Sequence, residues 1–262
     1  MKRITLTALY LCLCLYGFAQ SSGQAVTGDN IQGRPLAAAF DNIHWITRPA
    51  DKTITVVGIA GRKRSRDQAI ADALADAARK VSLYYGVYGE ATAILQEGSN
   101  LLDYFADTKY SLNITNRAEL YIDGLVYDKE KDVYEKNGSV YVRARYSGVQ
   151  DVPSYKSEVK NNVPDWVREY RAEIPGFMVG IGVAKNKGTL QKTCVASYEN
   201  AIVSLLSRLS SKIEESILDV EGKGRITRNV TKSKGTLSAV MILETWFDKK
   251  TGSVWTLLVA KE

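Results

Sequence analysis

Histidine, cysteine and proline are scarce in this chain of 262 residues, which contains one histidine, three cysteines and five prolines. A single histidine, His44, excludes a metal site built on a histidine pair, and a Ser-His-Asp triad would depend on it alone. We expect His44 to be a structural or surface residue. Three cysteines are too few for a disulfide scaffold, and five prolines exclude Pro-rich and collagen-like chains. Hydrophobic residues make up 45% and charged residues 24%, which argues against wholesale disorder.

The first nineteen residues have the pattern of a secretory signal peptide. A basic pair follows the first methionine, and residues 4–18 are apolar apart from two threonines. Gly17 and Ala19 supply the small residues that place cleavage between Ala19 and Gln20. A membrane anchor is the competing interpretation, but a spanning helix needs about 20 apolar residues, and the polar residues from Gln20 onward end this run too early. We therefore expect export to the periplasm or to the outer membrane.

The cysteines raise the question of a lipid anchor. Cys12 and Cys14 lie inside the apolar run, but Leu11 and Leu13 precede them where a lipid-attachment site has a small residue. We expect both cysteines to be removed with the signal peptide. Cys194 then remains alone, so no intrachain disulfide can form in an oxidising compartment. Its helical surroundings favour a buried, inert thiol over a reactive one.

The charge of the chain is mildly basic. Cleavage would lower the formal net charge of +6 by two, which suits attraction to anionic envelope surfaces better than dedicated nucleic-acid binding. The densest basic cluster consists of Arg62, Lys63, Arg64 and Arg66. Two interpretations stay open for it: contact with anionic lipid headgroups or acidic glycans, and a solvated loop before a helix. Because the chain is expected to be exported, we predict no nucleic-acid partner.

The chain repeats a set of features in the same order. Trp45 is followed by an apolar strand pattern that contains Gly58, and Trp166 is followed by a similar pattern that contains Gly180. Each pattern leads into a basic loop and then a long helical pattern, and each half ends in Gly-Ser-Val followed by an aromatic residue. These matches predict a tandem duplication.

The expected organisation has five parts. They are a signal peptide (1–19), a flexible leader (20–40), a first unit (41–150), a linker (151–163) and a second unit (164–262). Each unit is predicted to be a strand–helix–strand–strand module in which an antiparallel sheet packs on one long helix, so the fold class is α+β. One helix covers one face of a sheet only, so we also expect the halves to pair or the chain to form oligomers.

The helix of the first unit has a clear start signal. Ser65 and Gln68 have the spacing of a capping box, and apolar residues then recur with a helical period up to residue 81. Many alanines make this helix slim and permit close approach to a sheet. Asp72, Asp76 and Lys80 follow at four-residue steps and are predicted to form a solvated ladder of charges. Tyrosines 84, 85 and 88 are expected to end the helix and to pack on the sheet.

Strands are predicted around the first helix at residues 53–60, 112–114, 120–122 and 140–145. In the second unit, a helical stripe runs from Val195 to Leu209 and is continued by Ile213 and Ile217. Two further strands are predicted after it, at residues 236–247 and 253–260.

These features resemble a known family. A tryptophan before Val-Gly-Ile-Gly or Val-Gly-Ile-Ala, a basic loop, an Ala-x-x-Asp-Ala-x-x-Asp-Ala helix at residues 69–77 and a Pro-Asp-Trp opening at residues 164–166 are similar to the bacterial LPP-twenty lipoproteins. The resemblance implies units of the dodecin type and association with the outer membrane. It implies no enzymatic activity, and it brings no catalytic residues to this chain. The chain departs from the family in lacking its lipid-attachment site.

One glycine pattern imitates a cofactor motif. Gly180-Ile181-Gly182 begins like a dinucleotide fingerprint, but Lys185 occupies the third glycine position and no parallel βαβ unit follows. We predict a tight strand end there. No catalytic, cofactor-binding or metal-binding residues are predicted.

The sequence favours a non-catalytic protein of the cell envelope with a structural or interaction role in assembly or adhesion. Its partners would be other envelope proteins or a second copy of itself, with peripheral contact to an anionic membrane or glycan. The alternative is a periplasmic carrier that binds a small ligand between the two units. An enzyme is the weakest hypothesis, because the chain lacks a recognisable set of nucleophile, base and metal ligands.

Overall fold

The computed structural model describes residues 54–96, 104–105, 108–114, 117–136, 138–149, 152–209, 211–220, 224–248 and 250–261. The predicted signal peptide, its Ala19–Gln20 cleavage site, the leader, His44 and Trp45 lie outside the described residues. Within the described ranges, no helix combines the length and the apolar character needed to cross a bilayer.

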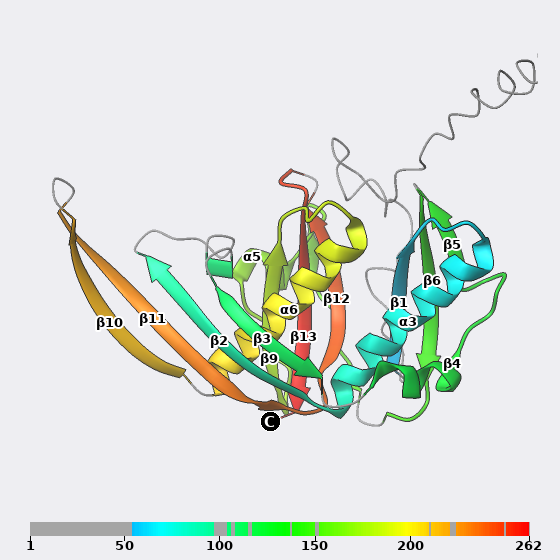
Figure 1. Ribbon diagram of the computed structural model, residues 1–262, viewed down its shortest axis with the longest axis horizontal. Helices are drawn as coiled ribbons and strands as arrows, with labels where there is room; N and C mark the ends of the chain where they lie inside the picture. The colour runs from blue at the N-terminus through cyan, green and yellow to red at the C-terminus, as the bar shows by residue number, and fades with distance from the viewer. Residues whose placement is uncertain are drawn as a thin grey trace, which may run out of the picture.

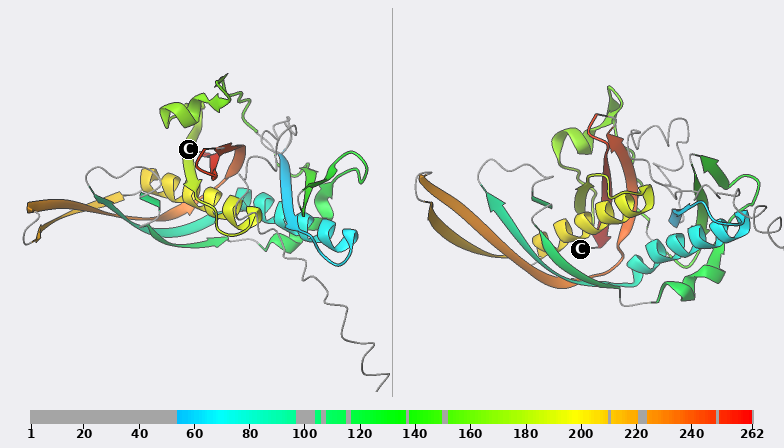
Figure 2. Two further views of the ribbon diagram at one scale, coloured as in Figure 1. Left: turned by 90° about the horizontal axis from the view of Figure 1, so that it is seen from above. Right: turned by 45° about the horizontal axis from the view of Figure 1, so that its top comes forward.

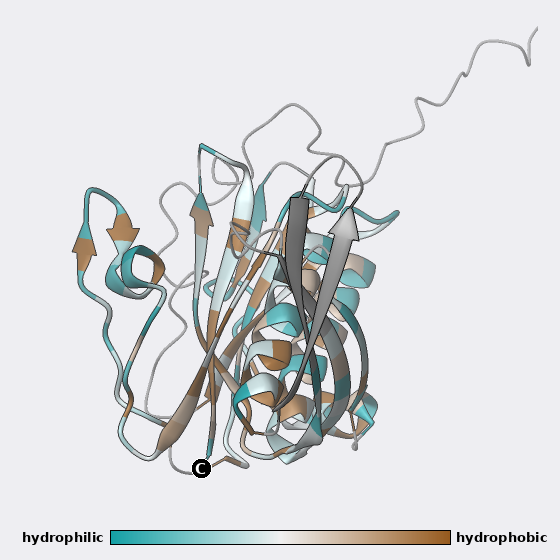
Figure 3. Cartoon of the chain, turned by 90° about the vertical axis from the view of Figure 1, so that its left-hand side faces the viewer, coloured by the Kyte–Doolittle hydropathy of each residue, from teal (hydrophilic) through white to brown (hydrophobic). Residues whose placement is uncertain are grey.

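The chain has a mixed α+β fold with several antiparallel sheets, which confirms the predicted fold class. Two helices of 20 residues each, α3 (Arg66–Tyr85) and α6 (Leu190–Leu209), run one after the other along the long axis of the molecule (Figures 1 and 2). Apolar residues gather on the strands and on the helix faces turned toward them (Figure 3). The core therefore lies between the helices and the sheets.

The sheet beneath α3 is built around one central strand. Its order is β1 (Ile54–Gly61), β6 (Ser139–Tyr146) and β4 (Leu125–Val126), and β5 (Val133–Lys136) also pairs with β6. β1 and β6 are antiparallel, with Gly58 opposite Val142. The predicted strands at 53–60 and 140–145 are confirmed by β1 and β6.

The sheet beneath α6 has three strands. Its order is β12 (Met241–Asp248), β13 (Ser253–Lys261) and β9 (Phe177–Ala184). The predicted strand at 253–260 is confirmed. The strand predicted at 236–247 is confirmed by β12 for residues 241–247 only, because the chain turns at Ala239, which has a positive φ of 50°, and β12 begins after that turn.

A third sheet joins strands from both halves of the chain. Its order is β10 (Ser211–Val220), β11 (Gly224–Leu237), β2 (Val87–Gln96) and β3 (Lys109–Ile114). β2 follows α3, whereas β10 and β11 follow α6, and the antiparallel pair β2–β11 runs from Val87–Leu237 to Gln96–Arg228. The strands after the two helices thus share one sheet, which differs from the predicted arrangement of a separate sheet for each unit.

Two local predictions are wrong. Residues 120–122 lie in a 3₁₀ helix, η2 (Ala118–Gly124), where Tyr121 is buried and Leu120 is exposed. Ile213 and Ile217 belong to β10 and do not extend the second helix, which ends at Leu209. Pairing with β11 decides the state of that segment, and helical periodicity does not report such long-range pairing.

The start of α3 is as predicted. Ser65 is the N-cap, and its Oγ accepts a hydrogen bond from the Gln68 amide at 3.2 Å. The helix ends at Tyr85, before Gly86, which has a φ of 142°. Tyr88 therefore lies in β2 and not at the end of the helix.

Glycines let both helices lie directly on a strand. A Cβ atom added at Gly58 would lie 1.8 Å from the Ala73 carbonyl oxygen of α3. One added at Gly182 of β9 would lie 2.2 Å from the Ala201 nitrogen of α6. Any larger residue at either position would push the helix off the sheet. The Gly-Ile-Gly pattern is thus explained by helix packing within β9, and the strand ends at Ala184, inside the stretch 180–185 where a strand end is predicted.

The remaining short elements precede β9. They are the two-stranded sheet β7 (Val159–Lys160) with β8 (Val163–Pro164), and helix α5 (Asp165–Glu169). Trp166 of α5 is fully buried, and its indole nitrogen donates to the Glu244 carboxylate of β12 at 2.7 Å. The Ser157 hydroxyl donates to the same carboxylate at 2.9 Å. The Pro-Asp-Trp segment is therefore anchored in the core by a buried polar contact.

Candidate functional site

The predicted basic cluster lies between β1 and the start of α3. Arg62, Lys63 and Arg64, together with Gln68, line a wide and open hollow. Arg66 is the first residue of the helix and lies outside the lining of the hollow. The structure thus brings three of the four predicted contact residues together.

Two of these four cations are neutralised by acidic side chains. The Lys63 ammonium lies 2.6 Å from Asp72, and the Arg66 guanidinium donates to Glu135 at 2.5 Å. Both pairs are about half exposed, so each contributes at most about 1 kcal/mol to stability. Sequence reasoning missed Glu135 because it comes from β5, far along the chain.

Arg62 and Arg64 differ from Lys63 and Arg66 in their side-chain partners. Neither side chain has an ion pair or hydrogen bond to another residue in the part of the chain that the structure describes, and only the backbone amide of Arg62 is bonded, to the Gly138 carbonyl. Both side chains are exposed. The open hollow therefore presents two guanidinium groups, whose planar forks match the oxygens of phosphate and carboxylate groups.

The predicted charge ladder on α3 is wrong at Asp76 and Lys80. Both side chains are buried, with 2% and 9% of their surface exposed, and the Lys80 ammonium lies 2.8 Å from Asp76 Oδ2. Oδ2 also accepts the Ile59 amide at 2.9 Å, and Lys80 donates to the Val57 carbonyl at 2.5 Å. Because α3 lies so close to Gly58, this pair reaches the free edge of β1 and satisfies backbone groups there.

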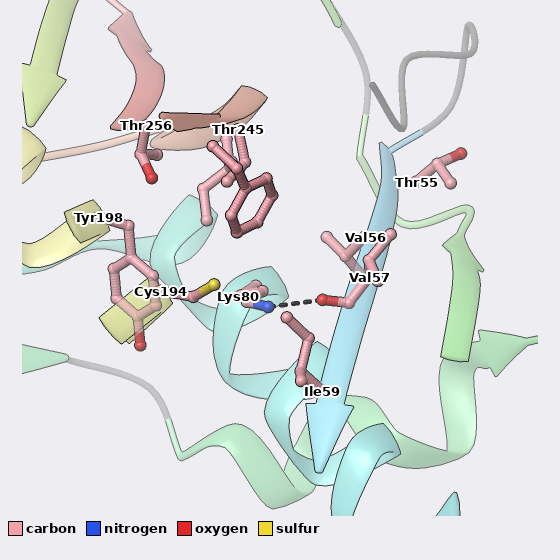
Figure 4. Close-up of a pocket in the computed structure, with 11 residues that line it drawn as sticks. Thr55, Val56, Val57, Ile59, Lys80, Cys194, Tyr198, Thr245 and Thr256 are labelled. Atoms are coloured by element: carbon pink, nitrogen blue, oxygen red, sulfur yellow. Dashed lines mark hydrogen bonds between the residues drawn. The ribbon is translucent and has the colours of Figure 1, made fainter. Parts of the chain in front are cut away.

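A small pocket lies beside this ion pair. Its lining comes from β1, α3, α6, β12 and β13, and Figure 4 shows the Lys80 ammonium bonded to the Val57 carbonyl beside Cys194 and Tyr198. The complete lining is Thr55, Val56, Val57, Ile59, Lys80, Cys194, Tyr198, Ile242, Thr245, Phe247 and Thr256. Its cavity volume, counted as the space open to the centres of water molecules, is only about 40 Å³. That space is far below the roughly 300 Å³ of small-molecule sites, so we assign the pocket to packing between the sheets.

Cys194 faces this pocket and is buried, as predicted. Burial is the main cause that raises the pKa of its thiol to about 12, with a smaller lowering effect from Lys80 and a smaller raising effect from the Asp76 carboxylate. The thiol is thus held in its unreactive, protonated form.

A more open groove lies between α3 and α6, over β2 and β3. Its lining is Arg79, Leu83, Val87, Leu112, Ile114, Val195, Tyr198, Glu199 and Ile202. The space open to the centres of water molecules is about 230 Å³. Both halves of the chain contribute to the groove, so sequence reasoning about either half alone could not find it.

Two charged residues line this groove. Glu199 is half-buried and accepts a hydrogen bond from the Tyr110 hydroxyl at 2.9 Å. Burial raises the pKa of the Glu199 carboxyl, while the Tyr110 hydrogen bond and the charge of Arg79 act against that shift. Arg79 is exposed and interacts with the Tyr198 hydroxyl.

Tyr85, at the end of α3, packs mainly on η2 and meets the sheet through Tyr146 of β6. Tyr85 stacks on Tyr121 with ring centres 4.7 Å apart, and its hydroxyl lies 3.1 Å from that of Tyr146. Tyr88 instead donates to Glu90 on β2, and Lys234 of β11 pairs with the same carboxylate at 2.8 Å. These contacts tie η2 to α3 and β2 to β11.

No group of three or more histidine, cysteine, aspartate and glutamate side chains among the described residues is arranged to hold a metal ion. The chain matches no family model, no curated protein and no solved structure.

Proposed function

We propose that the protein is an exported, non-catalytic component of the bacterial cell envelope that docks on an anionic membrane surface through its basic hollow. The observation that supports this function is the pair of exposed guanidinium groups on Arg62 and Arg64, which have no acidic partner among the described residues. The signal-peptide pattern supports the location, and the resemblance to LPP-twenty lipoproteins supports the class.

The expected binding is weak and reversible. Each arginine near an anionic bilayer contributes about 1 kcal/mol to the binding free energy. In about 0.1 M salt, this attraction is largely lost beyond about 10 Å from the surface. Two free arginines thus supply peripheral attachment and leave the protein able to reach envelope partners.

We also propose that the two halves are tandem copies of one module. Gly58 lies against Ala73 and Ala77 of α3, and Gly182 lies against Ser197 and Ala201 of α6. Gly182, Ser197 and Ala201 follow their counterparts in the first half, Gly58, Ala73 and Ala77, by the same number of residues. This match supports Gly182, and not Gly180, as the counterpart of Gly58.

A second set of contacts follows the same spacing. Asp76 accepts a hydrogen bond from the backbone of Ile59, and Asn200 donates one to the backbone of Val183 at 2.7 Å. In each half, the residue before an alanine in the helix reaches the backbone just after the packing glycine. The two halves differ in the group that is hydrogen-bonded. The Asp76 carboxylate accepts from a backbone amide of β1, whereas the Asn200 amide donates to a backbone carbonyl of β9.

Sedimentation with lipid vesicles tests the docking function. We expect the mature chain to sediment with vesicles that contain phosphatidylglycerol and to be released by salt. The variant R62A/R64A should bind roughly 30-fold more weakly, since it loses about 2 kcal/mol. The matched control is K63A/D72A, which removes one ion pair of the hollow without changing its net charge and should bind nearly as well as wild type. Equal losses in both variants, or binding to an acidic polysaccharide but not to vesicles, would contradict docking on a membrane through this hollow.

A second candidate function is a small-ligand carrier. The groove between α3 and α6 favours it, because the groove is open, mostly apolar and lined by both halves of the chain.

A further inference from the structure

The groove between α3 and α6 has an apolar wall that is partly exposed to solvent. Leu112 and Ile114 of β3 and Val195 of α6 are half-buried there, while Leu83 and Ile202 are buried behind them. Covering this exposed apolar surface with the apolar part of a ligand would be favourable. The groove therefore suits the apolar side of a small molecule.

Opposite charges line the same groove from different helices. Arg79 belongs to α3 and Glu199 to α6, and the described residues show no ion pair between these two side chains. Glu199 is positioned by the Tyr110 hydroxyl, and Arg79 lies close to the Tyr198 hydroxyl. Each keeps hydrogen-bonding capacity for a ligand, because a guanidinium has five N–H donors and a carboxylate accepts several hydrogen bonds.

Glu199 costs stability where it lies. Its carboxylate is half-buried beside apolar side chains, and no lysine or arginine is within ion-pair distance among the described residues. Burying a carboxylate that has one hydrogen bond and no ion pair is unfavourable. A cationic group of a ligand would compensate for this cost. The guanidinium of Arg79 could at the same time bind an anionic group of the same ligand.

The size of the groove limits the ligand. About 230 Å³ is slightly below the range of sites for drug-sized molecules. It suits a molecule of the size of one amino acid and is too small for a flavin or a dinucleotide.

We propose that this groove binds an apolar α-amino acid, with its carboxylate on Arg79, its ammonium on Glu199 and its side chain against Leu112, Ile114 and Val195. The inference rests on the carrier function given above as the second candidate and is independent of the docking hollow. A zwitterion is the one small head group that satisfies both charges at once, and the planar guanidinium holds a carboxylate in a bidentate manner.

Three probes with the same branched apolar body separate the contributions of the charges. Isothermal titration would compare L-leucine with 4-methylpentanoate, which keeps only the carboxylate, and with 3-methylbutylamine, which keeps only the ammonium. We expect leucine to bind at least tenfold more tightly than either analogue. The variants E199Q and R79Q should each lower leucine affinity at least tenfold, while the control R171Q, which removes an exposed charge outside the groove and the hollow, should not change it.

A neutral fluorescent probe separates failure of the ligand class from failure of the carrier function. 1-Naphthol, which is close to leucine in size and uncharged at pH 7, should bind in the wild-type groove, should be displaced by leucine, and should not bind to V195W, in which the indole fills the groove. Dye binding without displacement by leucine, or an analogue that binds as tightly as leucine, would overturn the amino-acid ligand and leave the carrier function intact. Failure of the dye and of all three probes to bind would overturn both. Circular dichroism would verify that each variant is folded.

Discussion

Replacing Lys80 with methionine should destabilise the protein more than replacing Lys80 and Asp76 together. In the K80M variant, the Asp76 carboxylate stays buried with 2% of its surface exposed and keeps only the hydrogen bond from Ile59. Its second oxygen already has no partner. Breaking a buried ion pair from one side costs about 3–5 kcal/mol, a large part of the roughly 5–15 kcal/mol that stabilises a domain.

The double variant D76N/K80M removes both charges. The amide oxygen of an asparagine at position 76 can still accept the Ile59 amide, and the methionine can cover the pocket beside Cys194, so only the donor to the Val57 carbonyl is lost. We expect a loss of about 1–2 kcal/mol, which is smaller than for K80M alone. Asn200 in α6 shows that an amide can occupy the corresponding position.

Urea denaturation followed by tryptophan fluorescence would measure these free energies of unfolding. The control is K63M, which breaks the half-exposed pair with Asp72 and should cost less than about 1 kcal/mol. A loss below about 1 kcal/mol for K80M, or a double variant no more stable than K80M, would refute the role assigned to the buried pair.

Three further predictions concern packing, reactivity and pH. G182A should lower the midpoint of urea denaturation by the equivalent of at least about 1–3 kcal/mol, because its new methyl group would meet the backbone of α6; a change within error would contradict the close packing. Cys194 should react with a thiol reagent only after denaturant unfolds the chain, since its thiol is buried and its pKa is raised to about 12; rapid labelling of the native protein would contradict this. Burial raises the pKa of Glu199 above its unfolded value, so stability present at acidic pH is lost as pH rises through the folded pKa. E199Q should therefore unfold at higher urea than wild type at pH 7 and at similar urea near pH 4; lower stability at pH 7 would contradict the assignment.

The sequence predicted those elements whose ends and faces are set by residues close together in the chain. The Ser65 cap and the apolar stripe located α3 because side chains three and four positions apart meet on a helix face. β1 and β13 were found for a similar reason, since both are bounded by turn residues. Ile213 and Ile217 also fit a helical period, so their spacing predicts a longer helix than the structure has. The strand state of the segment at 211–220 depends on β11, which no local pattern reports.

The basic hollow could be predicted from the sequence as a cluster of positive charges. Which of these charges lack an acidic partner could not be predicted. Arg62 and Arg64 differ from Lys63 and Arg66 only through partners on α3 and β5. The role of Asp76 left one signal in the sequence, because Asp76 and Asn200 both precede an alanine that packs on a glycine strand. The groove lined by Arg79 and Glu199 left none, because it forms only when both halves pack together.

Fractionation of the cell envelope is the most direct test of docking through the basic hollow. Wild-type protein should remain with the membrane fraction at low ionic strength and leave it in a salt wash, whereas R62A/R64A should already be soluble at low ionic strength. If the variant fractionates with membranes as wild type does, at every salt concentration, the basic hollow does not hold the protein at an anionic surface.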